Sequence, residues 1–412
     1  MRLLHTTTLE FAEFFKPPTY GILSHRWGDV EVSYDDMLNH KKLKGEGYRK
    51  VIDCCALAKS RGLDYVWIDT CCIDKRSSAE LSEAINSMWK WYTHAKECYA
   101  YLVDVDSMTT PVGRPFESPP YKSSAWFNRG WTLQELLAPR VVIFYDVFWR
   151  RIGEKLDDSI LSEITRITPI PRDCLISHFS LNNACVAKKF SWAATRRTTR
   201  PEDTAYCLLG LVGINMPLLY GEGPKAFLRL QQEIIRQTND ESVFAWRDPY
   251  AADDYTCGLL ASEVAAFAFS GDVRTADLVQ RDPYTVTNQG LDLHAKASQV
   301  PDGSVVIMPL NSITRPTYQC AIALTRVRNR YSRIATAGLG QHLKTVYPSQ
   351  CEPSDADTSQ RFIVRLQRWD TEYEPANVVL NAKIQRFFMK RIERTKRYKE
   401  MKAAQDAALD LL

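Results

Sequence analysis

The feature that most constrains the fold is an alternation of short apolar strands with helices over the first 150 residues. Four segments have the composition of buried strands: Tyr20–Ser24, Tyr65–Ile68, Cys98–Val103 and Val141–Tyr145. Three segments between them have the spacing or the end signals of helices: Lys50–Arg61, which Gly62 ends, Ser77–Tyr92, which Ser77 and Glu80 would cap, and Trp131–Leu137. Strands that alternate with helices predict an α/β fold, in which helices cover both faces of a parallel sheet.

The sequence changes character twice after residue 150. Residues 151–247 are mostly helical, and Pro224 suits the first turn of a helix over Lys225–Gln237. Residues 248–380 indicate a smaller β-rich domain. Its expected strands are Tyr284–Thr287, Leu291–Lys296, Val305–Leu310 and Tyr318–Leu324, with turns at Asn288–Gly290 and Asp302–Gly303. Residues 381–412 predict a basic amphipathic helix.

The basic charge of the chain is concentrated in that last helix. Residues 383–402 hold nine Lys or Arg and two acidic residues, a local charge of +7, so the net charge of +4 leaves −3 for the remainder. The body is therefore not expected to bind nucleic acid. Ile384, Phe387, Phe388 and Ile392 form one apolar stripe on the helix. The stripe either docks on the protein or lets residues 383–402 contact an anionic membrane.

Cysteine usage and the lack of long apolar runs indicate a soluble, cytoplasmic protein. No run of about 18 apolar residues predicts a transmembrane helix, and Glu10 and Glu13 interrupt the apolar start of the chain. The eleven cysteines include the adjacent pairs Cys54-Cys55 and Cys71-Cys72, but no CxxC pair and no zinc-finger spacing. We therefore expect reduced thiols, no bound metal and no resident cofactor.

Three segments carry a resemblance to a known family. They are Leu23-Ser24-His25-Arg26-Trp27-Gly28-Asp29, then Trp67-Ile68-Asp69-Thr70-Cys71-Cys72-Ile73-Asp74-Lys75, and then Trp126-Phe127-Asn128-Arg129-Gly130-Trp131-Thr132-Leu133-Gln134-Glu135-Leu136. In this order and spacing they resemble the heterokaryon-incompatibility (HET) domain of filamentous fungi. Residues 1–150 would then be the HET domain, and residues 151–247 its helical extension.

The resemblance implies a fold and a function. It implies self/non-self recognition and programmed cell death, a form of innate immunity, and a remote similarity to Toll/interleukin-1 receptor (TIR) domains. TIR domains have a flavodoxin-like parallel sheet, and some cleave NAD with a glutamate in a short Trp-Cys-x-x-Glu-Leu helix. Residues 131–136 have the same spacing, with Thr132 where Cys is usual. Glu135 is therefore the candidate catalytic residue.

A carboxylate at this position suits the cleavage of nicotinamide from ribose. The leaving group is a neutral pyridine that needs no acid, and a carboxylate can hydrogen-bond the ribose hydroxyls and stabilise the positive charge that develops on the sugar. Such a group would be presented beside the carboxyl ends of parallel strands. The alternative is that Glu135 is a helix-surface acid or a salt-bridged acid, with Arg129 as a candidate partner.

Five further residues are candidates for binding NAD as a substrate. Asp69 and Asp74 follow a buried strand and either line the strand-end crevice or cap the loop. Arg26 either contacts a phosphate of the dinucleotide or pairs with Asp29. Trp27 either stacks on the ligand or packs under its loop, and Trp131 begins the Glu135 helix. Cys71 and Cys72 are the wrong neighbours for a magnesium site at the two acids.

A second cluster of charges has a structural interpretation. Arg196, Arg197 and Arg200 lie next to Glu202 and Asp203 in the sequence and indicate an ion-pair network between elements rather than an anion site. Gly221–Gly223 is too short to cradle a phosphate, and we expect it to form a turn before the Pro224 helix.

Two functions are compatible with these observations. The first is a cell-death effector that hydrolyses NAD at the nicotinamide-ribose bond. The second is a non-catalytic signalling module that acts by homotypic assembly, with a second copy or another signalling protein as its partner.

Overall fold

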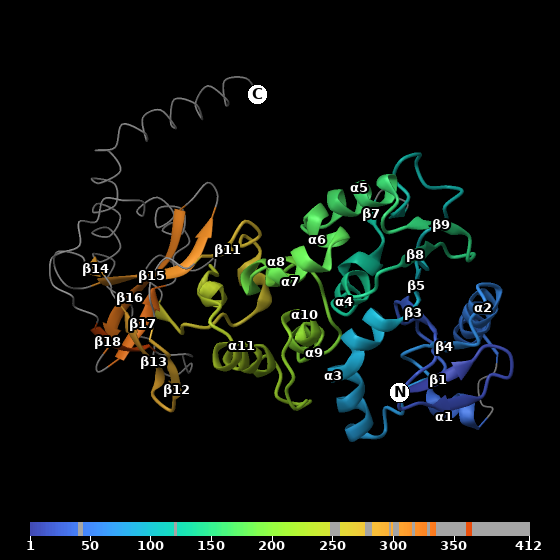
Figure 1. Ribbon diagram of the computed structural model, residues 1–412, viewed down its shortest axis with the longest axis horizontal. Coiled ribbons are helices and arrows are strands. Elements are labelled where there is room, and N and C mark those ends of the chain that lie inside the picture. The colour runs from blue at the N-terminus through green and yellow to red at the C-terminus, as the bar shows by residue number, and fades with distance from the viewer. Residues whose placement is uncertain are drawn as a thin grey trace. The chain divides into compact units, whose positions relative to one another are not determined.

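The computed structural model of this chain describes residues 1–39, 44–118, 122–247, 256–276, 282–295, 298–299, 305–314, 318–327, 330–334 and 360–364. The chain divides into two compact units (Figure 1). The first unit consists of residues 1–184 and 192–230, and the second of residues 185–191 and 231–412. The predicted helix over residues 381–412, with its apolar stripe and the basic stretch 383–402, lies outside the described residues.

The first unit is built on a seven-stranded mixed sheet with the strand order β2-β1-β4-β3-β5-β8-β9. The strands are β1 (Arg2–His5), β2 (Phe11–Glu13), β3 (Gly21–His25), β4 (Tyr65–Trp67), β5 (Glu97–Tyr101), β8 (Val142–Tyr145) and β9 (Arg151–Glu154). The four central strands, β4, β3, β5 and β8, are parallel, and the outer strands pair antiparallel. The predicted α/β fold is therefore confirmed, and the sheet is mixed rather than wholly parallel.

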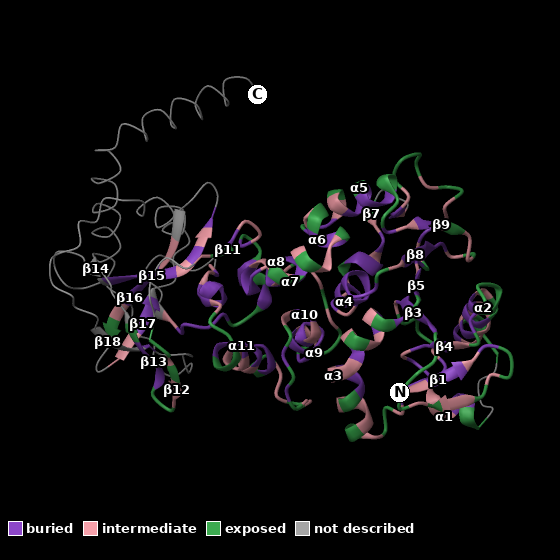
Figure 2. Cartoon of the chain, viewed as in Figure 1, coloured by how far each residue is buried: buried purple, intermediate pink, exposed green. Residues whose placement is uncertain are grey.

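The order of the parallel strands defines where a ligand is expected. The first of them along the chain, β3, lies between the second, β4, and the third, β5. The chain thus adds β4 on one side of β3 and then β5 on the other, so the direction of strand addition reverses at β3. Ligands of open α/β sheets bind at the carboxyl ends of the strands where the strand order reverses in this way. Strands β3, β5 and β8 are almost wholly buried (Figure 2), because helices and loops cover both faces of the sheet.

Three helices between the central strands match the sequence prediction, with local differences. They are α2 (Glu46–Ser60), α3 (Ser78–His94) and α4 (Thr132–Leu137). Helix α2 begins four residues before Lys50 and ends before Gly62, whose φ of 74° only glycine adopts without strain. The Ser77 side chain caps α3 by accepting from the Glu80 backbone N–H. The Glu80 carboxylate instead accepts from Arg2 of the neighbouring strand β1, so only half of the expected capping box forms.

Several short elements complete the first unit. The helices are α1 (Tyr34–Leu38), η1 (Ala125–Asn128), α5 (Asp158–Ile167), α6 (Arg172–Ile176), α7 (His178–Asn183), α9 (Asp203–Tyr206) and α10 (Leu209–Val212), and β6 (Glu117–Ser118) pairs with β7 (Lys122–Ser123). Helices α8 (Val186–Ala193) and α11 (Lys225–Gln237) each cross the division between the units. The expected turn at Gly221–Gly223 is present, since both glycines have positive φ and their backbone N–H groups donate to Glu202.

The second unit contains a largely antiparallel sheet of nine strands among the described residues. They are β10 (Thr256–Cys257), β11 (Arg274–Thr275), β12 (Thr285–Thr287), β13 (Gly290–Ala295), β14 (Ser298–Gln299), β15 (Val305–Thr314), β16 (Tyr318–Val327), β17 (Arg330–Ile334) and β18 (Gln360–Val364). Two 3-10 helices, η2 (Glu241–Phe244) and η3 (Val264–Phe267), precede most of these strands. The four strands expected from alternation correspond to β12, β13, β15 and β16, and β17 pairs with β18 in parallel.

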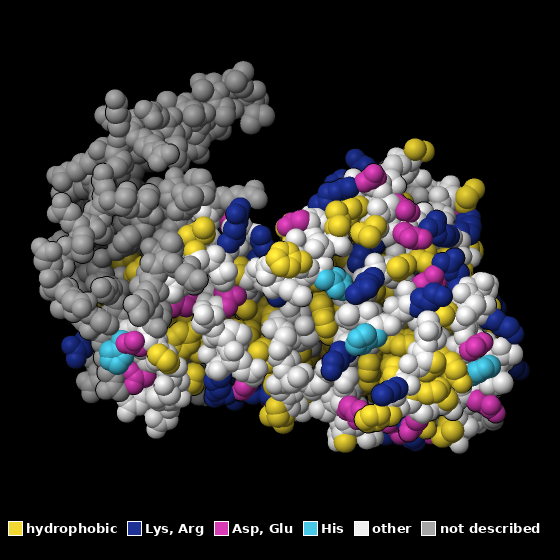
Figure 3. Space-filling model, in the orientation of Figure 1, with side chains coloured by type: hydrophobic (Ala, Val, Ile, Leu, Met, Phe, Trp, Pro, Cys, Tyr) yellow, Lys and Arg dark blue, Asp and Glu magenta, His cyan; other side chains and the backbone are white. Residues whose placement is uncertain are grey.

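The visible surface of the described residues carries both basic and acidic side chains. On the face shown in Figure 3, Lys and Arg side chains are interspersed with Asp and Glu side chains. Among the helices of the described ranges, none combines the length and the apolar character needed to cross a membrane.

The ten cysteines in the described ranges all have free thiols, and eight of them are buried. Burial raises the pKa of the Cys55 thiol to about 12, and it also raises the pKa of Cys54 and Cys98. We therefore expect a thiol reagent to react slowly with the native protein and with all eleven cysteines after denaturation. A shortfall in the denatured protein that a reductant restores would reveal disulfides and contradict this expectation.

Candidate active site

The Glu135 carboxyl group lies inside the first unit rather than on its surface. It belongs to α4, which packs against β3, α3 and η1, and only 6% of the residue is exposed. The Ser24 hydroxyl at the end of β3 donates to Glu135 Oε2 at 2.5 Å, and the Trp126 indole N–H donates to Ser24 Oγ at 2.9 Å. Because Glu135 is buried, the interpretation of a helix-surface acid is wrong. Among the described residues Glu135 also forms no ion pair with Arg129.

Burial decides the protonation state of this carboxyl group. Removal from water raises the pKa of Glu135 to about 8, although the Ser24 hydrogen bond and the charge of Arg129 oppose the shift. The nearby Asp69 carboxylate adds to the increase. Glu135 is therefore mostly protonated at neutral pH when no ligand is bound.

This pKa predicts a specific pH dependence of stability. The folded state binds the Glu135 proton more tightly than the unfolded state, so this contribution is complete below about pH 4.3 and is lost as the pH rises through about 8. The free energy of unfolding of the Glu135→Gln variant should therefore rise relative to wild type between pH 5 and pH 8, by at most about 1.4 kcal/mol per pH unit. Urea unfolding of both proteins at the two pH values measures this difference, and parallel pH profiles would contradict it.

A second polar chain begins one residue after Ser24. The His25 Nε2–H donates to Asp69 Oδ1 at 2.9 Å, and the Trp27 indole N–H donates to Asp69 Oδ2 at 2.7 Å. Burial opposes the ionisation of Asp69, but these two bonds and the charge of Lys75 outweigh it and hold the pKa of Asp69 well below its usual range. Burial lowers the pKa of His25, whose Nδ1 has no partner among the described residues, so His25 is a neutral donor to an ionised Asp69.

The N-terminal end of α4 is held by residues that follow it in the chain. Arg196 Nη1 donates to the Arg129 carbonyl oxygen at 2.9 Å and to Thr132 Oγ1 at 3.0 Å. The Trp131 side chain hydrogen-bonds Asp203. Burial lowers the pKa of Arg196 to about 10. Arg196 and Asp203 thus position the start of α4. Arg196 donates to the Arg129 backbone and to Thr132, and among the described residues it does not join the expected ion-pair network.

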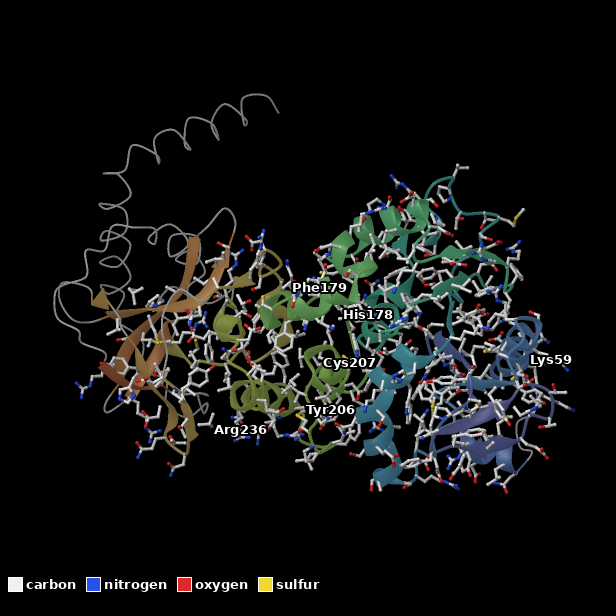
Figure 4. The ribbon with its side chains drawn as sticks, in the orientation of Figure 1. Lys59, His178, Phe179, Tyr206, Cys207 and Arg236 are labelled. Carbon is white, nitrogen blue, oxygen red and sulfur yellow. The ribbon has the colours of Figure 1, made fainter. Side chains whose placement is uncertain are left out.

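The C-terminal end of α4 is held by a buried lysine. Lys155 Nζ donates to the Leu136 carbonyl oxygen at 3.2 Å and to that of Pro139 at 2.7 Å. A cation near the last carbonyl groups of a helix satisfies acceptors that have no partner within the helix. His178 on α7, labelled in Figure 4, hydrogen-bonds the Leu137 backbone. Glu135 therefore sits on a short helix that is fixed at both ends.

The structure separates the remaining predicted residues into two groups. Asp69 and Trp27 are hydrogen-bonded to each other, and 40% of Trp27 is exposed. Asp74 is turned to Arg76, whose backbone and side-chain N–H groups both donate to it, as the loop-capping alternative expects. Arg26 is half-buried and has no ion pair with Asp29 among the described residues.

In the described part of the chain, the site has the groups of an organic-ligand site and not those of a metal centre. Within the described ranges, no three or more His, Cys, Asp or Glu side chains are grouped as metal ligands. The arrangement at the end of β3 is one of carboxyl, hydroxyl, indole and cationic groups, which suits an organic ligand better than a cation.

These observations define an α/β protein with a buried carboxyl group at the carboxyl ends of its central strands. The family model of the heterokaryon incompatibility protein (HET) matches residues 20–120. Residues 20–120 are therefore similar to the HET domain. A second family model, a domain of unknown function (DUF8212), matches residues 225–292.

One curated relative extends the similarity beyond that match. The vegetative incompatibility protein HET-E-1 of Podospora anserina is 42% identical over 227 residues, which cover 53% of this chain and 16% of the relative. The chain thus spans a small part of that protein. No solved structure matches the chain. The HET match ends before η1 and α4. Ser24, which lies inside the match, is hydrogen-bonded to Trp126 on η1 and to Glu135 on α4.

Proposed function

We propose that the chain is a heterokaryon-incompatibility effector, located in the cytoplasm, whose first unit hydrolyses NAD at the nicotinamide-ribose bond. The similarity to the vegetative incompatibility protein of Podospora anserina supports the incompatibility role. The observation that carries the chemistry is the Ser24–Glu135 hydrogen bond at the carboxyl end of β3. The parallel-strand order, second-first-third-fourth, is that of flavodoxin-like sheets and supports a TIR-like interpretation of the fold.

In the proposed reaction the C1′–N bond of NAD breaks and nicotinamide leaves with the electron pair. A water molecule adds to the oxocarbenium ion of the ribose and releases one proton, so that ADP-ribose is the second product. The Glu135 carboxylate would stabilise the positive ribose and accept hydrogen bonds from its hydroxyl groups. Ser24 would orient the carboxyl group, and the fixed ends of α4 would limit its movement.

The protonation of Glu135 provides a means of selecting the substrate. Without a ligand, burial keeps the carboxyl group largely neutral at pH 7. The nicotinamide ring of NAD is positively charged, and a positive charge nearby favours the ionised form of a carboxyl group. Binding of oxidised NAD would therefore generate the carboxylate that the reaction needs, and a neutral analogue would not.

The alternative is a non-catalytic module that acts by homotypic assembly. The low exposure of Glu135 favours it, because a buried, protonated and hydrogen-bonded carboxyl group is also a sufficient structural element. In that case Glu135 stabilises the junction of α4 with β3, and the signalling surface is elsewhere.

Expression of the chain from an inducible promoter in a filamentous fungus separates the two functions. The effector proposal expects cellular NAD to fall before viability does, and it expects the Glu135→Gln variant to cause neither change. Cell death with unchanged NAD would overturn the hydrolase and favour the assembly module. Glu83→Gln, on the exposed side of α3, is the matched control and should behave as wild type.

A further inference from the structure

Two cations lie beside the Trp27 indole. Lys75 Nζ lies 3.7 Å from the centroid of the Trp27 ring, and Arg129 Cζ lies 5.5 Å from it. Among the described residues neither side chain forms an ion pair or a hydrogen bond. Nearby cations behave differently: Arg2 pairs with Glu80, and Lys50 pairs with Glu31.

The indole between these cations is held in a fixed orientation. Its N–H donates to Asp69, and Asp69 is held in turn by His25. Trp27 follows β3, while Lys75 follows β4 and Arg129 precedes α4. The three side chains thus come from separate segments that meet at the carboxyl ends of the parallel strands, where ligands of such sheets bind.

The local charge is positive. Lys75, Arg129 and Arg196 are cations, whereas Asp69 is ionised and already accepts two hydrogen bonds. Glu31 also acts on Lys75, but its charge is paired with that of Lys50. Burial raises the pKa of Glu135 to about 8, so its carboxyl group adds little negative charge at pH 7. Burial lowers the pKa of Lys75; the charges of Asp69 and Glu31 oppose this shift, and the charge of Arg129 adds to it. The like charges of Lys75 and Arg129 beside one indole ring repel each other. An anion placed between them would relieve that repulsion.

We propose that Lys75 and Arg129 bind the diphosphate group of a nucleotide beside the Trp27 ring. The inference rests on the proposed function, since it concerns the same site and deepens it by naming the residues that recognise the ligand. Arginine binds phosphate oxygens through two parallel N–H groups, and lysine acts as a point charge. The exposed face of the indole can stack on a ribose or a base.

Isothermal titration of the full chain with ADP, adenosine and inorganic pyrophosphate tests the site without any turnover of NAD. ADP should bind at least about tenfold more tightly than adenosine, since a hydrogen bond to a charged group contributes roughly that factor or more. Inorganic pyrophosphate should compete with ADP. The double variant Lys75→Met/Arg129→Met should weaken ADP binding by about a hundredfold if the two contacts are independent.

A matched control removes the same two charges elsewhere. Lys59 on α2 and Arg236 on α11 are exposed and are labelled in Figure 4. Lys59→Met/Arg236→Met should bind ADP as wild type does. If the first double variant does not fold, the single Lys75→Met variant makes the same comparison with Lys59→Met.

The outcomes also distinguish this inference from the hydrolase proposal. Equal ADP binding by the two double variants, equal binding of adenosine and ADP, or no competition by pyrophosphate would overturn it, even if the protein cleaves NAD. ADP binding that depends on Lys75 and Arg129 would support it even if no nicotinamide is released, and only the hydrolase would then be withdrawn.

Discussion

Glu135→Gln should reduce NAD cleavage by at least about 10²–10³-fold, the usual cost of removing a group that stabilises transition-state charge. Gln keeps the size of the side chain and an oxygen that can accept from Ser24 Oγ, now 2.5 Å from Glu135 Oε2. It cannot carry the negative charge that the oxocarbenium ion requires. The variant should therefore fold normally and lose activity, as measured by initial rates of nicotinamide release and by circular dichroism.

Two companion variants sharpen this prediction. Ser24→Ala removes the donor to the carboxyl group and should lower the rate less than Glu135→Gln, because the carboxyl group itself remains. Glu83→Gln makes the same chemical change at an exposed position and should leave the rate unaltered. A Glu135→Gln protein that is as active as the Glu83→Gln protein would show that Glu135 is not the catalytic acid.

Trp126→Ala should destabilise the protein by about 3–5 kcal/mol, the range for truncating a large buried aromatic residue. Only 1% of Trp126 is exposed, and its ring contacts Phe127 and Phe144 at centroid distances of 4.9 Å and 5.8 Å. The substitution also removes the indole N–H that donates to Ser24. Urea unfolding measures the change in the free energy of unfolding.

Trp126→Phe separates packing from hydrogen bonding. It keeps an aromatic ring but removes the donor, so it should cost less than Trp126→Ala. Phe179→Ala is the control, because Phe179, labelled in Figure 4, is 76% exposed, and the change should stay within about 0.5 kcal/mol. A Trp126→Ala variant no less stable than Phe179→Ala would contradict the packing described for β3 and α4.

The central strands could be predicted because they are buried on both faces and form continuous apolar runs. Strand β3, for example, is buried at all five residues. The outer strands β1, β2 and β9 were missed, because they are short and carry exposed or polar residues such as Glu13 and Arg151. Half of the predicted Ser77 capping box was wrong, since Arg2, from a distant part of the chain, donates to the Glu80 carboxylate.

The sequence named some residues of the candidate site but not the environment that holds them. The spacing around Trp131 and Leu136 identified Glu135 as a candidate. A local pattern does not reveal that α4 is buried and packs against β3. Arg196 and Lys155 were not identified as supports of α4, because their partners lie 64 and 19 residues away along the chain. A basic residue in a mostly apolar segment, as at Lys155, is the available signal, and it does not name its partner.

Release of nicotinamide from NAD by the purified 412-residue chain tests the central claim most directly. The assay compares wild type with Glu135→Gln at neutral pH, at low protein concentration and at a concentration high enough to promote assembly. We predict that wild type releases nicotinamide and ADP-ribose in equal amounts and that Glu135→Gln releases neither above background. No release by folded wild-type protein at either concentration, or equal release by both proteins, would contradict the assignment of Glu135 as the catalytic residue of an NAD hydrolase.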